Sequence, residues 1–119
     1  MKDKLRKFFK ILEIEFQDLE DALETYRDAL ESRYEKKEIT EYVYKENNAL
    51  LNREIGDIRI IKENVAELSG EEYADLDEAA ARVVEIIENF KDFPPVVHRY
   101  MERKVEKVLE YVRILDKQH

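Results

Sequence analysis

Apolar side chains recur along the first third of the chain at spacings of four and three, in strict alternation. This spacing brings them onto one stripe of an α-helix, the arrangement by which helices pack against one another. The pattern predicts a helix over residues 3–35, roughly 50 Å long at about 1.5 Å per residue. The stripe consists of Leu5, Phe9, Leu12, Phe16, Leu19, Leu23, Tyr26 and Leu30.

A second apolar pattern predicts a helix over residues 40–68, with Thr40 as its N-cap. No Gly or Pro lies between the two patterns, and the first stripe stays in phase through Tyr44, so one continuous helix remains an alternative. We favour a break within residues 36–40, because Arg33, Lys37 and Thr40 would otherwise occupy consecutive positions of the apolar stripe.

Two further helices are predicted over residues 71–91 and 95–116. Gly70 ends the second helix, and Ser69 with Glu72 has the spacing of a capping box. Pro94 and Pro95 separate the last two helices, since proline cannot donate a backbone hydrogen bond. We therefore expect an all-α bundle of four helices, formed by a single domain over residues 1–119.

Composition supports this fold class and excludes several functions. Charged residues make up 42% of the 119 residues, and there are only two Gly and two Pro, too few for the tight turns of a hairpin-rich sheet. No cysteine and no long apolar run is present, so we expect a cytoplasmic protein without a membrane span. Abundant Glu, Lys and Arg are also typical of hyperthermophile proteins.

Charge is unevenly distributed along this acidic chain. Residues 1–14 hold five cations against two acids, whereas residues 63–92 hold ten acids against two cations. We expect the basic first turns to lie beside acidic surface of the second or third helix. The net charge of −8 argues against nucleic-acid binding, which depends on Lys and Arg at phosphates.

A small helical chain also suggests a non-catalytic partner of a nucleic-acid-modifying system. The chain is similar in size and class to the HEPN proteins, the helical partners of minimal nucleotidyltransferases. Their R-x-x-x-x-H signature is absent, because Phe93 stands five residues before His98. This function remains a second alternative.

One short motif points to metal chemistry. Glu54-Ile55-Gly56-Asp57 resembles the E-x-G-D piece of the MazG-type all-α nucleotide pyrophosphatases. The resemblance implies a magnesium site at Glu54 and Asp57, completed by an upstream acidic pair. The pairs with suitable spacing are Glu35 with Glu38 and Asp21 with Glu24. Outside this alternative the sequence predicts no cofactor and no catalytic residue, and we favour a protein that is not an enzyme.

Three residues are unusual for the interior of the second helix. Asn47 and Asn48 are poor helix formers, and Gly56 costs about 1 kcal/mol relative to Ala. A buried Asn can fix the register of packed helices, and Gly allows close backbone approach. The sequence leaves open whether these residues lie at an interface or face water.

The first helix is much longer than the fourth, so an apolar segment should extend beyond a monomeric bundle. Exposed apolar surface of that extent marks an interface, and two-fold dimers are the commonest way to bury it. We therefore expect a homodimeric structural or protein-interaction module that also accommodates a further protein partner. The predicted interface residues are Leu5, Phe8, Phe9, Leu12, Phe16, Leu19 and Leu23.

Overall fold

The computed structural model describes residues 2–91 and 93–117, with side chains up to residue 115. Within these residues the chain forms four α-helices and no strand. The helices are α1 (Lys2–Glu35), α2 (Glu41–Leu68), α3 (Leu76–Glu88) and α4 (Pro95–Lys117). The prediction of an all-α bundle is confirmed for this part of the chain.

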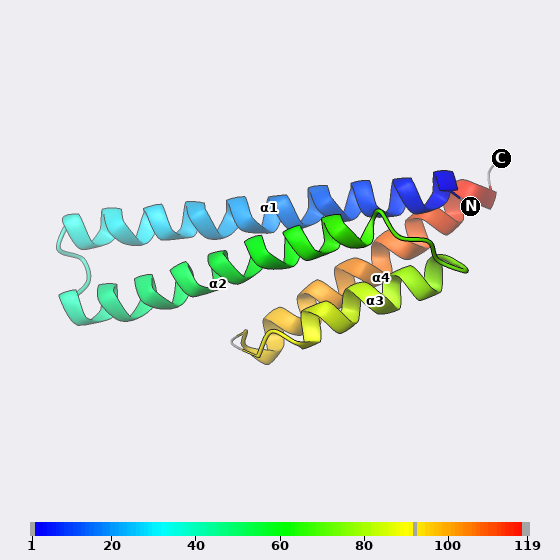
Figure 1. The fold of residues 1–119 in the computed structure, drawn as a ribbon. Coiled ribbons are helices and arrows are strands. Elements are labelled where there is room, and N and C mark those ends of the chain that lie inside the picture. Colours follow the sequence, from blue (N-terminus) through cyan, green and yellow to red (C-terminus); the bar gives the residue numbers. More distant parts are fainter. Residues whose placement is uncertain (1, 92, 118–119) are drawn as a thin grey trace.

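The helices form two antiparallel hairpins that pack against each other (Figure 1). α1 packs on α2 and α4, and α3 packs on the same two helices, so the four stand at the corners of a square in chain order. The first and last turns of the described chain lie at the same end of the molecule (Figure 1).

All four helices contribute to one hydrophobic core. Its fully buried side chains include Phe8, Leu12 and Phe16 of α1, Ile58 and Ile61 of α2, Val83 and Ile87 of α3, and Met101, Val105 and Val112 of α4. Each such side chain stabilises the fold by roughly 1.5–3 kcal/mol relative to exposure, so the core holds the two hairpins together.

α1 ends at Glu35 through a capping motif that normally requires glycine. The Lys37 amide donates to the Tyr34 carbonyl at 3.0 Å and the Glu38 amide to the Arg33 carbonyl at 2.9 Å, the pairing of a Schellman motif. Lys37 takes the left-handed conformation this motif demands, with φ 61°. The two helices are therefore not continuous.

The other side of this turn matches the predicted N-cap. Thr40 Oγ1 accepts a hydrogen bond from the Val43 amide at 3.2 Å and so begins α2. The rings of Tyr34 and Tyr44 stack with their centroids 4.4 Å apart and join the two helices near the turn. The predicted cap position is confirmed.

The predicted start of the third helix at residue 71 is wrong, because α3 begins five residues later. Ser69 is the C-cap of α2 rather than part of a capping box, and its hydroxyl donates to the Ala66 carbonyl at 2.6 Å. Tyr73 is buried, and its hydroxyl donates to the Leu68 carbonyl at 2.7 Å. Residues 71–75 therefore close the end of α2 instead of forming a helical turn.

The cap of α3 lies at Asp75. Its carboxylate accepts a hydrogen bond from the Glu78 amide at 2.8 Å, while the Glu78 carboxylate accepts one from the Ala74 amide at 2.7 Å. This reciprocal pair satisfies two backbone donors that the helix start leaves open. At its other end α3 stops at Glu88, three residues before the predicted end, with Asn89 as its C-cap.

The molecule is elongated, with a radius of gyration of 17.0 Å and a longest dimension of 56 Å. A compact chain of this length has a radius of gyration of roughly 13–14 Å. The α1–α2 hairpin extends past the turn between α3 and α4 and accounts for this difference (Figure 1). We call this extension the arm: residues 22–35 of α1, the turn, and residues 41–54 of α2.

Candidate functional site

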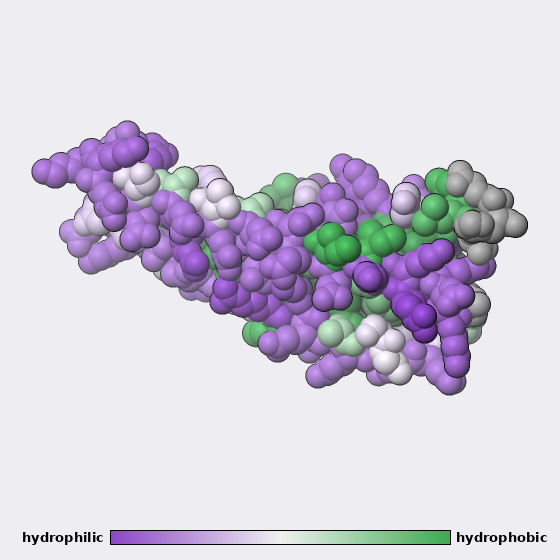
Figure 2. Space-filling view, turned by 90° about the horizontal axis from the view of Figure 1, so that it is seen from above, coloured by the Kyte–Doolittle hydropathy of each residue, from purple (hydrophilic) through white to green (hydrophobic). Residues whose placement is uncertain are grey.

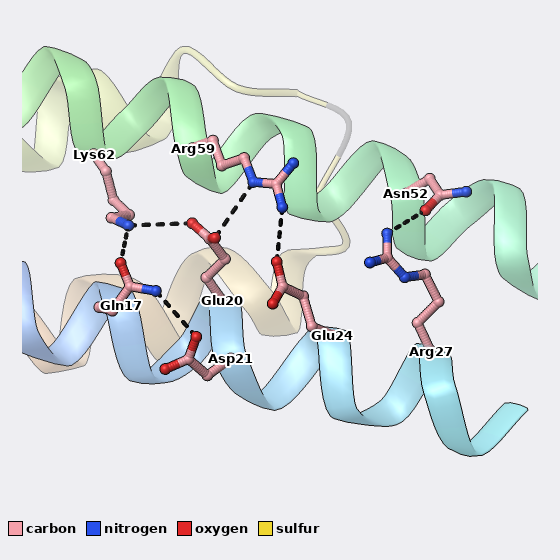
Figure 3. A network of polar contacts seen from close by, with 8 residues as sticks. All are labelled: Gln17, Glu20, Asp21, Glu24, Arg27, Asn52, Arg59 and Lys62. Atoms are coloured by element: carbon pink, nitrogen blue, oxygen red, sulfur yellow. Dashed lines mark hydrogen bonds and ion pairs between the residues drawn. The ribbon is translucent and has the colours of Figure 1, made fainter.

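One side of the α1–α2 hairpin is joined by polar contacts. They lie on the side that faces away from α3 and α4, which pass behind them in Figure 3. The residues are Gln17, Glu20, Asp21, Glu24 and Arg27 on α1 and Asn52, Arg59 and Lys62 on α2. Because these polar groups already contact one another, the candidate contact surface is the opposite side of the arm.

Glu20 is the centre of these contacts and one of the few buried acids. Lys62 Nζ donates to its Oε1 at 3.2 Å and Arg59 Nε to its Oε2 at 3.3 Å. Burial alone raises the pKa of Glu20, but the hydrogen bonds and positive charges of Lys62 and Arg59 outweigh burial and lower the pKa below its usual value. Glu20 therefore joins the two helices as a carboxylate.

The opposite side of the arm is apolar and exposed. Residues seven apart lie on the same side of a helix. Ala22 and Ala29 therefore lie on the side of α1 that carries Glu15, which contacts Lys104 of α4, and Tyr26 lies on the side that carries Leu19. On α2, Val43 and Leu50 lie seven residues apart, seven before Asp57. We call this surface the open face of the arm: Ala22, Tyr26, Ala29, Val43, Asn47 and Leu50. All six side chains are exposed, Tyr26 to 62% and Leu50 to 41%.

The predicted interface residues fall into two groups. Phe8, Phe9, Leu12 and Phe16 are buried in the core of the single chain. Leu5, Leu19 and Leu23 are partly buried and pack against that core. A second chain thus has no access to the four buried members, and the apolar surface open to it lies further along α1.

The Glu54–Asp57 motif lies at the base of the arm. The Glu54 residue is buried, with 9% of its surface exposed. Its neighbours one turn away on α2 are Leu51 and Ile58, which are both buried, and Ile58 belongs to the hydrophobic core. Burial raises the pKa of Glu54, and the negative charge of Asp57 raises it further. Both effects disfavour the ionised form of Glu54, at the point where the open face meets the α3–α4 hairpin.

The acidic pairs that a magnesium site needs do not gather around this motif. Glu24 accepts a hydrogen bond from Arg59 at 2.7 Å, and Asp21 accepts one from Gln17 at 3.0 Å. Glu35 and Glu38 lie at the tip of the arm, roughly 15 Å along the helices from Glu54. Among the described residues, no group of three or more His, Cys, Asp or Glu side chains could hold a metal ion.

The three unusual residues of α2 have different surroundings. Asn47 is exposed on the open face, and its side-chain amide donates to the Val43 carbonyl at 2.8 Å. Asn48 is half-buried. A Cβ atom built on Gly56 would meet nothing within 4 Å, so packing inside this chain does not require glycine there.

A separate apolar surface lies on the outside of α1 and α4, in the half of the molecule away from the arm. Hydrophobic side chains gather there on the face shown in Figure 2. A groove of about 450 Å³ between the two helices is lined by Ile11, Glu15, Lys104, Lys107, Val108 and Tyr111. We call it the α1–α4 groove.

A larger cleft of about 750 Å³ lies beside the first turns of α1. Lys2, Arg6 and Lys10 line one wall, and Glu71 and Glu72 contribute to another. The basic first turns thus face acidic residues of the α2–α3 connection, close to where the charge pattern placed them. Because both signs of charge line it, this cleft selects no single class of ligand.

Glu88 of α3 and Glu102 of α4 bring two carboxyl groups near each other. Burial raises the pKa of Glu102, the nearby Glu88 carboxyl raises it further, and His98 opposes the shift. His98 contacts the Phe90 carbonyl through Nε2, and its ring meets that of Phe93 edge to face. These contacts fasten the α3–α4 turn and give the histidine a structural role.

Fold and surface together define a small, elongated helical bundle with an exposed two-helix arm. No family model, curated protein or solved structure matches this chain. Over the described residues, no helix is both long and apolar enough to cross a membrane. The candidate functional sites are therefore the two apolar surfaces. Sequence periodicity indicated the arm but not the α1–α4 groove.

Proposed function

We propose that this protein is a homodimeric interaction module whose two-fold contact is the open face of the arm. The observation that carries the proposal is the exposure of Tyr26, Val43 and Leu50 on the side of the arm that α3 and α4 cover elsewhere in the bundle. The arm of a second copy would pack on this surface with its two helices, as α3 and α4 pack on the rest of the α1–α2 hairpin.

The position of α3 and α4 restricts how two arms can meet. In each copy the α3–α4 hairpin packs on the face of the α1–α2 hairpin that carries the open face, so two parallel arms would bring the two α3–α4 hairpins into collision. Antiparallel arms avoid this, because the tip of each arm then reaches the α3–α4 turn of the other copy. The result is one continuous bundle with four helices at every level.

Side-chain size permits close contact between two antiparallel arms. The small residues Ala22 and Ala29 allow the two copies of α1 to approach closely.

Light scattering of the native chain after size-exclusion chromatography tests the proposal. We expect a dimer at micromolar concentration, a monomer for Leu50→Glu, and a dimer for Ile60→Glu. Ile60 is the matched control because its exposure, 46%, is close to the 41% of Leu50, while it lies on the outer side of α2. Circular dichroism checks that both variants remain helical.

Two results contradict the proposal. A native chain that stays monomeric at micromolar concentration rejects the dimer altogether. A folded Leu50→Glu variant that stays dimeric moves the contact off the open face. The pair Phe9 and Phe16 is unsuitable for this experiment, because an acidic substitution at either buried ring would unfold the monomer.

A further inference from the structure

The α1–α4 groove has the shape and charge of a docking site, and the dimer contact leaves it free. Ile11 of α1 and Tyr111 of α4 line it, Tyr111 with 52% exposure, and Val108 forms a buried floor. Ile14, which is 53% exposed, follows Ile11 by one helical turn. A groove between two neighbouring helices suits a third helix, which can insert one apolar stripe between them. We propose that it binds an acidic amphipathic helix of a different protein.

Helical spacing identifies the residues along the groove. On α1, Lys7, Ile11, Ile14 and Asp18 follow one another at steps of four, three and four, so they share one face. On α4, Tyr100, Lys104, Lys107 and Tyr111 do the same. Two apolar side chains are thus neighbours on the α1 wall between a lysine and an aspartate, and two lysines lie between the tyrosines of the α4 wall.

The charge of these walls determines the sign of the partner. Lys104 forms an ion pair with Glu15 at 3.1 Å, which neutralises both groups. Of the charged residues along the groove, Lys7 and Lys107 then remain against one acid, Asp18. The groove is positive where the rest of this protein, with a net charge of −8, is negative. A second copy is a poor occupant, because the net positive charge of one groove would face the net positive charge of the other.

The same features disfavour the other anionic partners. The apolar residues line a groove rather than a convex ridge, and Glu15 and Asp18 lie beside them, so a flat anionic membrane would make fewer contacts. Nucleic-acid binding depends on several Lys and Arg at phosphates, whereas here Glu15 and Asp18 stand among the lysines. A helix with leucines on one face and glutamates on its flanks satisfies both the groove and its lysines.

The probe is a fluorescently labelled synthetic peptide that forms a helix with leucines on one face and glutamates on its flanks. The control peptide has the same sequence with Lys in place of each Glu. Fluorescence anisotropy measures the binding of each peptide to the full chain. We expect the acidic peptide to bind and the basic one not to bind. Ile14→Ser should weaken binding by roughly tenfold, since it removes an apolar side chain that the bound helix would cover. The matched control Ile60→Ser, on the outer side of α2, should leave it unchanged.

A charge exchange makes the test stricter. The double variant Lys7→Glu with Lys107→Glu should lose the acidic peptide and bind the basic peptide instead, while its mass by light scattering stays that of the native chain. Equal affinity of Ile14→Ser and the native chain for the acidic peptide overturns the proposal. So does binding of the native chain to phosphatidylglycerol vesicles that Ile14→Ser abolishes, which identifies the surface as a membrane contact.

Discussion

Replacing Glu20 by Ala tests whether burial or hydrogen-bond length determines the strength of the α1–α2 connection. The Glu20 side chain is 9% exposed, and its bonds to Lys62 and Arg59 are 3.2 and 3.3 Å long. Glu24 makes a shorter bond, 2.7 Å, to the same Arg59, but its side chain is 32% exposed. Burial predicts that Glu20 contributes more, whereas bond length predicts that Glu24 does.

The expected magnitude follows from these contacts. A hydrogen bond to a charged group contributes about 1.5–3 kcal/mol, and Arg59, whose side chain is 55% exposed, gives less than Lys62, whose side chain is 22% exposed. We therefore expect Glu20→Ala to lower the free energy of unfolding by about 2 kcal/mol. Glu24→Ala, which removes an exposed pair, should cost below about 1 kcal/mol. For a domain of this size the first loss corresponds to roughly 8 °C in melting temperature.

Urea unfolding followed by far-ultraviolet circular dichroism measures both variants at a fixed, low protein concentration. The pH dependence is a second readout. Because the pKa of Glu20 is lowered in the folded state, its contribution is present above the usual value of 4.5 and is lost as the pH falls through the folded-state pKa. The difference between native chain and Glu20→Ala should therefore shrink in acid. Equal losses for Glu20→Ala and Glu24→Ala, or a difference independent of pH, would refute this reasoning.

Three other substitutions should stabilise the chain. Gly56→Ala should add about 0.5–1 kcal/mol, because a Cβ there meets nothing within 4 Å, and a loss in melting temperature would contradict this. Lys37→Gly should add about 0.5–1 kcal/mol by relieving a left-handed backbone of φ 61°, while the neighbouring Lys36→Gly should not. Glu54→Gln should add about 1 kcal/mol at pH 7: burial and Asp57 raise the pKa of Glu54, so the native chain loses stability as the pH rises through that value. A gain that persisted below pH 4 in urea titrations would exclude this cause.

Periodicity predicted the helices well where their ends follow common rules. Thr40 and Pro95 mark the starts of α2 and α4 in sequence and in structure. The end of α1 was harder to assign because lysine stands at position 37, where glycine normally takes the left-handed conformation. Glu71 and Glu72 resemble the acidic first turn of a helix, but the hydroxyl of Tyr73 holds this segment against the end of α2 instead.

The candidate surface was less accessible from sequence for a different reason. Spacings of four and three predict which side of a helix packs against a neighbour but not how far along the helix that neighbour extends. On α1 the row Leu12, Leu19 and Tyr26 passes from the core to solvent, while Leu30 of the adjacent row stays buried, and the length of the α3–α4 hairpin decides where this change occurs. That length depends on the late start of α3 and on the turn before Pro95, neither of which the stripe of α1 encodes.

The two proposed surfaces lie far apart, and their separation gives the dimer a property that neither has alone. Two molecules of 56 Å that overlap along arms of roughly 20 Å form a rod of about 90 Å with one α1–α4 groove near each end. A partner with two acidic helices can occupy both grooves of such a rod if its linker spans the distance between them. It then binds more tightly than a partner with one acidic helix. Leu50→Glu, which separates the rod into monomers, should therefore abolish the gain from a tandem peptide while leaving the affinity for a single peptide unchanged.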